Sequence, residues 1–114
     1  MKVYFYEFID GKCFPYAKGI FVKEVEVIEK PKTFYPAKEK SYFPQSMCFV
    51  KKEDVGVLIG YNKNLIVFTE PNFEKAKSVF EENLRVKVEA AKKRLSDAEE
   101  RLKILMDCEV AVDA

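Results

Sequence analysis

The fold of this chain is decided by residues 72–108, NFEKAKSVFEENLRVKVEAAKKRLSDAEERLKILMDC. The segment contains no glycine or proline, and its last aromatic residue is Phe80, whereas every glycine and proline of the chain precedes it. Helix-forming residues fill it and apolar residues recur every three or four positions, which predicts a long amphipathic helix. Residues 1–71 are rich in aromatic and β-branched residues and are broken by turn residues, which predicts a β-sheet.

The helix is expected to begin at Asn72. Residues 69–72, TEPN, supply helix-capping side chains, and Pro71 is tolerated only near a helix start. The apolar stripe of the helix consists of Phe73, Ala76, Phe80, Leu84, Val88, Ala91, Leu95, Ala98, Leu102 and Leu105. From Val88 onward the spacing alternates between three and four residues. Before Val88 two steps of four follow each other, from Phe80 to Leu84 and from Leu84 to Val88, and such an irregularity in the repeat locally relaxes supercoiling.

The length of this segment leaves two interpretations open. A helix that runs unbroken to Cys108 is about 55 Å long, whereas a domain of this size is about 35 Å across. Either a partner chain covers the excess length, or the helix breaks near Leu95, where Ser96-Asp97-Ala98-Glu99 fits the capping-box pattern. We favour the single helix. The alternation of leucine with alanine permits close helix approach, so a homodimer or higher oligomer built on the C-terminal helix is expected.

Residues 1–71 predict a mainly antiparallel sheet, because turn signals leave only short connections between strands. Strands are expected at residues 2–9, 12–16, 20–30, 47–51 and 65–69. The first two would form a hairpin around Asp10-Gly11, a dipeptide that suits a tight turn. The proline-punctuated residues 31–44 are expected to form a long ordered loop. Residues 52–56 are expected to form a turn or a single helical turn, and residues 61–64 the tip of the last hairpin.

The sequence therefore predicts an α+β protein with one domain, residues 1–114. An N-terminal β-rich part, 1–71, is followed by one long C-terminal amphipathic helix, 72–108, and a tail, 109–114.

The 20 basic and 19 acidic side chains leave a net charge of +1, which argues against binding to duplex nucleic acid. Three widely spaced cysteines without a CxxC pair argue against a disulfide framework and a zinc site. With neither a signal peptide nor a membrane span expected, we predict a cytoplasmic protein.

The residue types needed for most catalytic mechanisms are missing. The sequence has no histidine, no glycine-rich phosphate loop and no paired-carboxylate motif, so we expect neither an enzyme, nor a cofactor, nor a metal site. All three arginines, however, fall on the predicted helix. Asn83, Arg94 and Arg101 lie within roughly 20° of one line beside the apolar stripe. Such arginines can bind phosphate through two parallel hydrogen bonds, or they can pair with glutamates across a helix interface.

Two aromatic pairs in residues 31–44 form a second candidate site. Phe34-Tyr35 and Tyr42-Phe43 each precede a proline, and Lys32, Lys38 and Lys40 lie between and beside them. Exposed rings interleaved with lysines could stack a nucleotide base and hold its phosphate. The alternative is that the same rings fill the core or form a structural lid.

The KEDVG turn at 52–56, the FTEPNFEKAK helix entry at 68–77 and the long Glu/Lys/Leu helix make the chain similar to small prophage-encoded proteins of Gram-positive bacteria. Within that group, its size and order of elements resemble the Thoeris anti-defence sponges, phage proteins that sequester cyclic ADP-ribose signals without cleaving them. The resemblance implies a symmetric oligomer that encloses a nucleotide, with an aromatic ring on adenine and Asn or Arg on ribose and phosphates. Phe73, Asn83 and Arg101 suit these roles, and Arg94 shares the arginine row.

Two functions remain open at this point. The first is a phage anti-defence protein in the host cell cytoplasm that binds and sequesters a cyclic nucleotide of the cyclic ADP-ribose type. The second is a structural or protein-interaction module of a phage or prophage, which docks on a host factor through residues 31–44 and has no small-molecule ligand.

Overall fold

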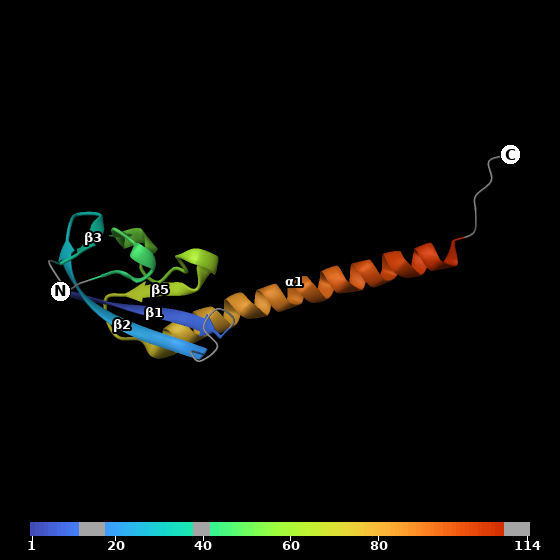
Figure 1. The fold of residues 1–114 in the computed structure, drawn as a ribbon, viewed down its shortest axis with the longest axis horizontal. Helices are drawn as coiled ribbons and strands as arrows, with labels where there is room; N and C mark the ends of the chain where they lie inside the picture. The colour runs from blue at the N-terminus through green and yellow to red at the C-terminus, as the bar shows by residue number, and fades with distance from the viewer. Residues whose placement is uncertain (12–17, 38–41, 109–114) are drawn as a thin grey trace. The chain divides into compact units, whose positions relative to one another are not determined.

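The structure is a computed structural model that describes residues 1–11, 18–37 and 42–108 (Figure 1). The strands are β1 (Lys2–Asp10), β2 (Lys18–Glu29), β3 (Thr33–Pro36), β4 (Val50–Lys51) and β5 (Leu65–Phe68). The helix is α1 (Phe73–Asp107), and three short 3-10 turns are η1 (Pro44–Ser46), η2 (Lys52–Asp54) and η3 (Tyr61–Lys63). The predicted α+β layout is confirmed. Two compact units, Met1–Phe80 and Glu81–Ala114, make up the chain.

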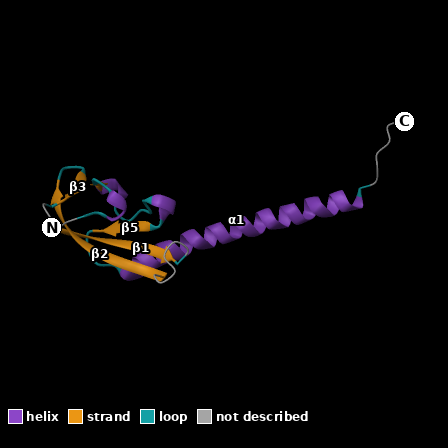
Figure 2. Cartoon of the chain, viewed as in Figure 1, coloured by secondary structure: helices purple, strands orange, loops and turns teal. Residues whose placement is uncertain are grey.

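The five strands form one sheet in the order β4-β3-β2-β1-β5, and every neighbouring pair is antiparallel (Figure 2). The longest pairing joins β1 to β2, from Lys2 opposite Glu26 to Asp10 opposite Lys18. Although β4 and β5 are the two edges, Val50 and Val67 belong to the same buried cluster, so the sheet is curled around this core. The expected antiparallel sheet is confirmed.

The first unit has a core on each face of the sheet, because successive side chains of a strand point to opposite faces. Val3 and Phe5 of β1 face the larger core, which also receives residues from every other strand and Phe43. Tyr6 faces the smaller core. That core consists of Tyr6, Ile66, Ala76 and Phe80, with Tyr4, Phe8, Ile20, Leu58, Phe68 and Val79 packed against it. The start of α1 therefore closes one face of the sheet.

Helix α1 begins where the capping residues predict. The side-chain Oδ1 of Asn72 accepts a hydrogen bond from the backbone N–H of Lys75 at 3.1 Å, as an N-cap residue does. The backbone N–H of Asn72 donates to the hydroxyl of Tyr6 at 2.9 Å, which ties the cap to β1. From Phe73 the helix runs without interruption to Asp107. It therefore does not break at Leu95, and the single-helix interpretation is the correct one.

The first hairpin differs from the prediction. Asp10 lies opposite Lys18, so a two-residue turn at Asp10-Gly11 is wrong, and the partner strand of β1 is β2. The predicted strand at 12–16 lies outside the described residues. Gly11 still takes a positive φ of 85°, so the sequence signal marks the end of β1 correctly without setting the length of the connection.

Residues 31–44 do not form a continuous loop, because they contain β3. Phe34 lies opposite Glu29 of β2 on one side and Val50 of β4 on the other. Pro36 ends the strand, where its missing N–H is tolerated, and the next donor, Ala37 N–H, bonds to the carbonyl of Glu26 at 3.0 Å. Residues 38–41 lie outside the described residues. The strand predicted at 47–51 is reduced to Val50–Lys51.

A hydrogen-bonded side chain fixes the turn before β5. The Nε2 of Gln45 donates to Glu7 and to Asn64, each at 3.0 Å, and its Oε1 accepts from the N–H of Tyr61 at 2.8 Å. Gly60 has a φ of 80°, and a Cβ at this position would collide with the Gln45 side chain. Residues 61–64 thus form a hairpin tip as predicted, between the paired residues Ile59 and Leu65.

Candidate functional site

The second unit presents the apolar stripe of α1 to solvent. Among the described residues of α1, Ala76 and Phe80 are buried, and both belong to the first unit. After Phe80 the exposed fractions of the large stripe residues are 42% for Leu84, 51% for Val88, 60% for Leu95, 56% for Leu102 and 71% for Leu105. A row of large apolar side chains facing water is the surface signature of an interaction site.

The stripe follows a heptad pattern whose two flanks differ in charge. Position a is occupied by Val88, Leu95 and Leu102, and position d by Leu84, Ala91, Ala98 and Leu105. The flank at position g is Lys87, Arg94 and Arg101, and the flank at position e is Arg85, Lys92 and Glu99. These flanks border the partner helix in a helix pair. One flank is therefore uniformly basic, and the other is mixed.

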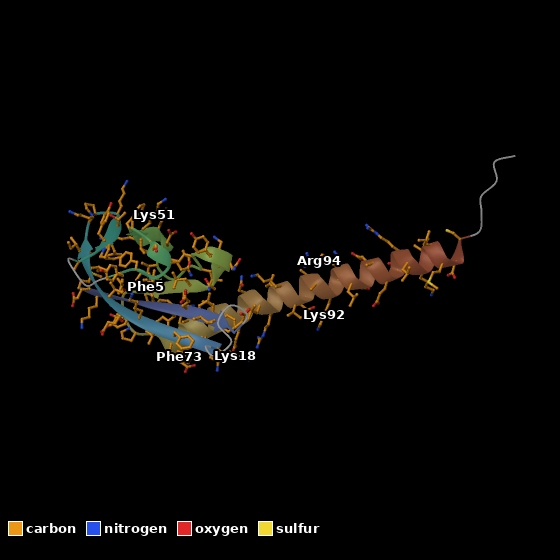
Figure 3. All side chains as sticks on the ribbon, viewed as in Figure 1. Phe5, Lys18, Lys51, Phe73, Lys92 and Arg94 are labelled. Carbon is orange, nitrogen blue, oxygen red and sulfur yellow. The ribbon has the colours of Figure 1, made fainter. Side chains whose placement is uncertain are left out.

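Three of the four residues predicted to bind a ligand lie along the second unit. Asn83 is half-buried, and Arg94 and Arg101 are exposed on the basic flank. Figure 3 shows the position of Arg94 along α1. A helix rises 1.5 Å per residue, so Asn83 and Arg101 are about 27 Å apart and Arg94 and Arg101 about 10 Å apart along the axis. One chain cannot bring all three to one nucleotide. A site that uses them needs a second helix.

The two site arginines also differ from their neighbours in their ion pairs. Arg85 lies 3.9 Å from Glu81 and Lys92 lies 3.7 Å from Glu89, so both cations have a carboxylate on their own helix. Within the described residues, neither Arg94 nor Arg101 has a carboxylate within 4.0 Å. Their guanidinium groups are free to bind an external anion.

The fourth predicted residue, Phe73, lies in the first unit at the start of α1. Its side chain is 47% exposed, and its ring centroid is 6.5 Å from that of Tyr6. A half-exposed ring can stack on a ligand, but the contact with Tyr6 also gives it a structural role. Ligand binding by Phe73, Asn83, Arg94 and Arg101 stays a prediction.

The aromatic pairs of residues 31–44 are divided between core and surface. Phe34 and Phe43 are buried, so for these two rings the alternative of a core role is the correct one. Their neighbours point outward: Tyr35 lies against Phe49, with ring centroids 5.8 Å apart, and Tyr42 has the ammonium of Lys23 6.0 Å from its centroid. In β3, strand alternation separates Phe34 from Tyr35, a signal that was present in the sequence. Lys38 and Lys40 lie outside the described residues.

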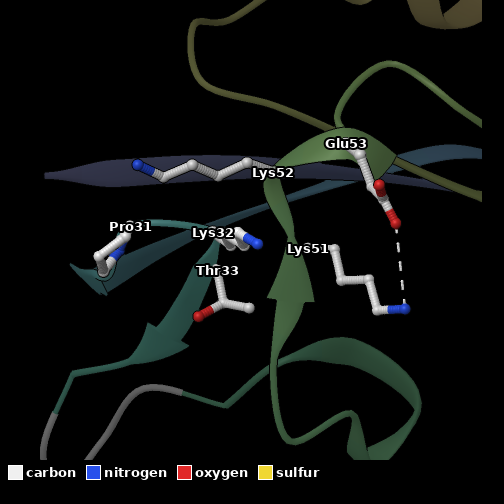
Figure 4. A pocket seen from close by; sticks show the side chains of 6 residues that line it. All are labelled: Pro31, Lys32, Thr33, Lys51, Lys52 and Glu53. Atoms are coloured by element: carbon white, nitrogen blue, oxygen red, sulfur yellow. Dashed lines mark ion pairs between the residues drawn. The ribbon is translucent and has the colours of Figure 1, made fainter.

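An open hollow of about 620 Å³ lies beside β3 and β4, lined by Pro31, Lys32, Thr33, Lys51, Lys52 and Glu53 (Figure 4). Two of its lysines are already engaged. Lys51 lies 4.0 Å from Glu53, and Lys52 lies 3.0 Å from Glu29 and 5.4 Å from the ring centroid of Phe34. Because carboxylates neutralise these cations, the hollow is a weaker anion site than the basic flank of α1.

A titratable pair lies on the face of the sheet that α1 covers. Burial, and next the carboxylate of Glu24, raise the pKa of the Tyr4 hydroxyl, which donates a hydrogen bond to Glu24. Tyr4 therefore stays protonated at neutral pH and serves as a donor rather than as a base.

In the described part of the chain, no three Cys, Asp or Glu side chains gather as metal ligands would. In the same part, no helix combines the length and apolar character needed to cross a membrane.

Comparisons with protein-family models, with curated proteins and with solved structures gave no match to this chain. Its function must therefore be argued from its own surface. The exposed stripe of α1 and its basic flank are the features that need a functional explanation, because the stripe is a regular row of large apolar side chains left open to solvent.

Proposed function

We propose that the chain is a non-enzymatic interaction protein that assembles with copies of itself through the second half of α1. The observation that supports this proposal is the solvent-facing stripe from Leu84 to Leu105. Copies of one chain suit each other because every copy carries the same stripe, and a symmetric pair covers both stripes at once.

The energetics favour a reversible assembly. Covering a leucine side chain contributes about 1.5–3 kcal/mol when it was fully exposed before, and these leucines are only 42% to 71% exposed. The eight leucines of a pair would together contribute on the order of 10 kcal/mol. Association itself costs about 4–15 kcal/mol. The two magnitudes are similar, so we expect a dimer that forms at high concentration and dissociates on dilution.

Sedimentation equilibrium of the full chain tests this proposal. We expect a mass that rises from one chain to two or more as the protein concentration increases to about 1 mM. The helical signal in far-ultraviolet circular dichroism should increase with assembly, because packing against a partner stabilises an exposed helix. A mass of one chain over the whole range would contradict the proposal.

A second candidate is sequestration of a cyclic nucleotide of the cyclic ADP-ribose type. The observation that favours it is the pair of arginines, Arg94 and Arg101, that lack a carboxylate partner within the described chain. In this function the oligomer holds the ligand without cleaving it, and the protein lowers the free concentration of an immune signal.

Calorimetry with cyclic ADP-ribose isomers tests the second candidate. The wild-type chain should bind one isomer and release it intact on heating. The double substitution Arg94→Ala/Arg101→Ala should weaken binding by about 100-fold or more, because two charge-assisted contacts are lost, and should leave the assembly in place. Arg85→Ala is the matched control, since Arg85 already pairs with Glu81. Absence of binding to every isomer would reject this function.

A further inference from the structure

We infer that the second copy lies antiparallel on the stripe of α1, with Leu95 opposite the partner's Ala98, and that this pairing gathers Arg94 and Arg101 of both chains into a site for phosphate-type anions. The inference rests on the proposed self-association. It adds the orientation of the partner, the register of the contact and the chemical class of a ligand.

The sizes of the stripe residues select the antiparallel orientation. In an antiparallel pair, position a of one helix meets position d of the other, so Leu95 meets Ala98 and Leu102 meets Ala91. Each central layer then holds one large and one small side chain, and one interaxial distance suits them all. A parallel pair stacks Ala91 on Ala91 and Ala98 on Ala98 between layers of valine or leucine, which leaves voids at the alanine layers. The charges at positions e and g discriminate less well between the parallel and antiparallel orientations, because each orientation has both attractive and repulsive pairs at these positions.

The charges of the flanks select the register within the antiparallel orientation. When Leu95 faces the partner's Ala98, the e flank brings Lys92 next to the partner's Glu99, and symmetry forms this opposite-charge pair twice. Sliding one helix by a heptad, so that Leu95 faces the partner's Ala91, keeps that leucine opposite an alanine but brings Leu102 opposite the partner's Leu84. That slide also places Lys92 on the partner's Lys92 and Arg94 on the partner's Arg94. The unshifted register therefore has the better electrostatic balance.

The same register concentrates positive charge on the g flank. There Arg94 lies next to the partner's Arg101, again twice, and the two arginine pairs are about 10 Å apart along the axis. Asp97 lies three residues from Arg94 and four from Arg101 on the outer side, so it reduces the charge of the flank without cancelling it. Like charges at this spacing oppose assembly. Guanidinium groups that face each other form a ready site for a phosphoryl group, which accepts hydrogen bonds from both and removes the repulsion.

Inter-chain cross-linking tests the orientation. In the inferred register Lys87 lies next to the partner's Cys108, an exposed free cysteine. The chain with Cys13→Ser, Cys48→Ser and Lys87→Cys should therefore form a covalent dimer with a short bismaleimide. Mass spectrometry should place its link between positions 87 and 108.

The control carries Lys87→Cys and Lys92→Cys, and serine replaces all three native cysteines. In this variant the thiol at position 87 lies next to the partner's thiol at position 92 only if the two helices are parallel. Lys92→Cys also removes the pairing of Lys92 with the partner's Glu99 in the antiparallel form, so this control favours the parallel arrangement. Linkage in the control but not in the first variant would overturn the inferred orientation.

Sedimentation equilibrium with and without inorganic pyrophosphate, at one ionic strength set with sodium chloride, tests the anion site. Pyrophosphate should tighten the dimer by about fivefold or more, a typical coupling between two binding events. Arg94→Gln/Arg101→Gln should abolish the response, whereas Arg85→Gln should keep it. Arg94→Glu turns two repulsive pairs into attractive ones, so this dimer should tighten without the anion and should no longer respond.

The outcomes separate this inference from the function on which it rests. A dimer that cross-links between positions 87 and 108 but ignores pyrophosphate overturns the anion site and leaves self-association standing. A response that survives in Arg94→Gln/Arg101→Gln has the same consequence, because the anion then binds elsewhere. A chain that stays monomeric with and without pyrophosphate overturns both.

Discussion

Leu95→Asp is expected to convert the assembled protein to a monomer without unfolding it. In a symmetric pair the substitution acts twice, removing two leucines from the contact and placing two carboxylates there. Each lost leucine costs about 1.5–3 kcal/mol, and each partly desolvated carboxylate adds a further penalty. A total of about 3 kcal/mol or more weakens association by at least about 100-fold. Sedimentation equilibrium measures this change, and circular dichroism reports the helix content.

Val86→Asp is the matched control for this substitution. Val86 is 59% exposed and Leu95 is 60% exposed, so an aspartate is equally open to solvent at either position in the single chain. They differ in heptad position, because Val86 occupies position f, on the side of the helix away from the stripe. The control should assemble like the wild type. Equal loss of assembly in both variants would mean that net charge, rather than the stripe, controls association.

The sequence predicts the helix well because the signals for it are local. Asn72 caps the first turn, Pro71 stands before it, and residues 73–107 contain no glycine or proline. The antiparallel nature of the sheet was predictable for the same reason, since short connections leave little choice. What the sequence does not reveal is the pairing of distant strands. The contact of β5 with β1 joins Phe68 to Tyr4, and no local signal encodes it.

The strand β3 was missed because two prolines and two aromatic residues suggest a loop more strongly than a strand. Its register with β2 and β4 overrides that preference, since pairing on both sides stabilises Phe34 in an extended conformation and buries its ring. Tertiary pairing commonly decides such short segments against their local propensity.

The candidate site was predictable in composition but not in geometry. The alignment of Asn83, Arg94 and Arg101 follows from helical periodicity alone, and the helix places them accordingly. The sequence could not tell which part of the stripe is buried, because Phe80 and Leu84 are both large apolar members of it. Phe80 is 5% exposed, whereas Leu84 is 42% exposed. The exposed part of the stripe therefore begins after Phe80.

Phe80→Ala is expected to destabilise the first unit by about 3–5 kcal/mol, the usual cost of removing a buried phenylalanine. Phe80 is 5% exposed, packs in the core with Tyr6 and Ile66, and has its ring centroid 5.9 Å from that of Phe8. These neighbours lie on a sheet that cannot collapse into the space left by the ring, so a cavity remains. Urea unfolding followed by tyrosine fluorescence measures the change in the free energy of unfolding.

Phe73→Ala provides the contrast that separates a core ring from a ligand-binding ring. Because Phe73 is 47% exposed and its ring centroid lies 6.5 Å from that of Tyr6, its truncation should cost about 1 kcal/mol. If Phe73 stacks on a nucleotide, Phe73→Ala should also weaken nucleotide binding by about tenfold or more while the fold persists, since one base–aromatic contact contributes about 1–3 kcal/mol. A loss of stability equal to that of Phe80→Ala would instead make Phe73 part of the core. In that case Phe73 would no longer be a predicted ligand-binding residue, and ligand binding would rest on the arginines of the second unit.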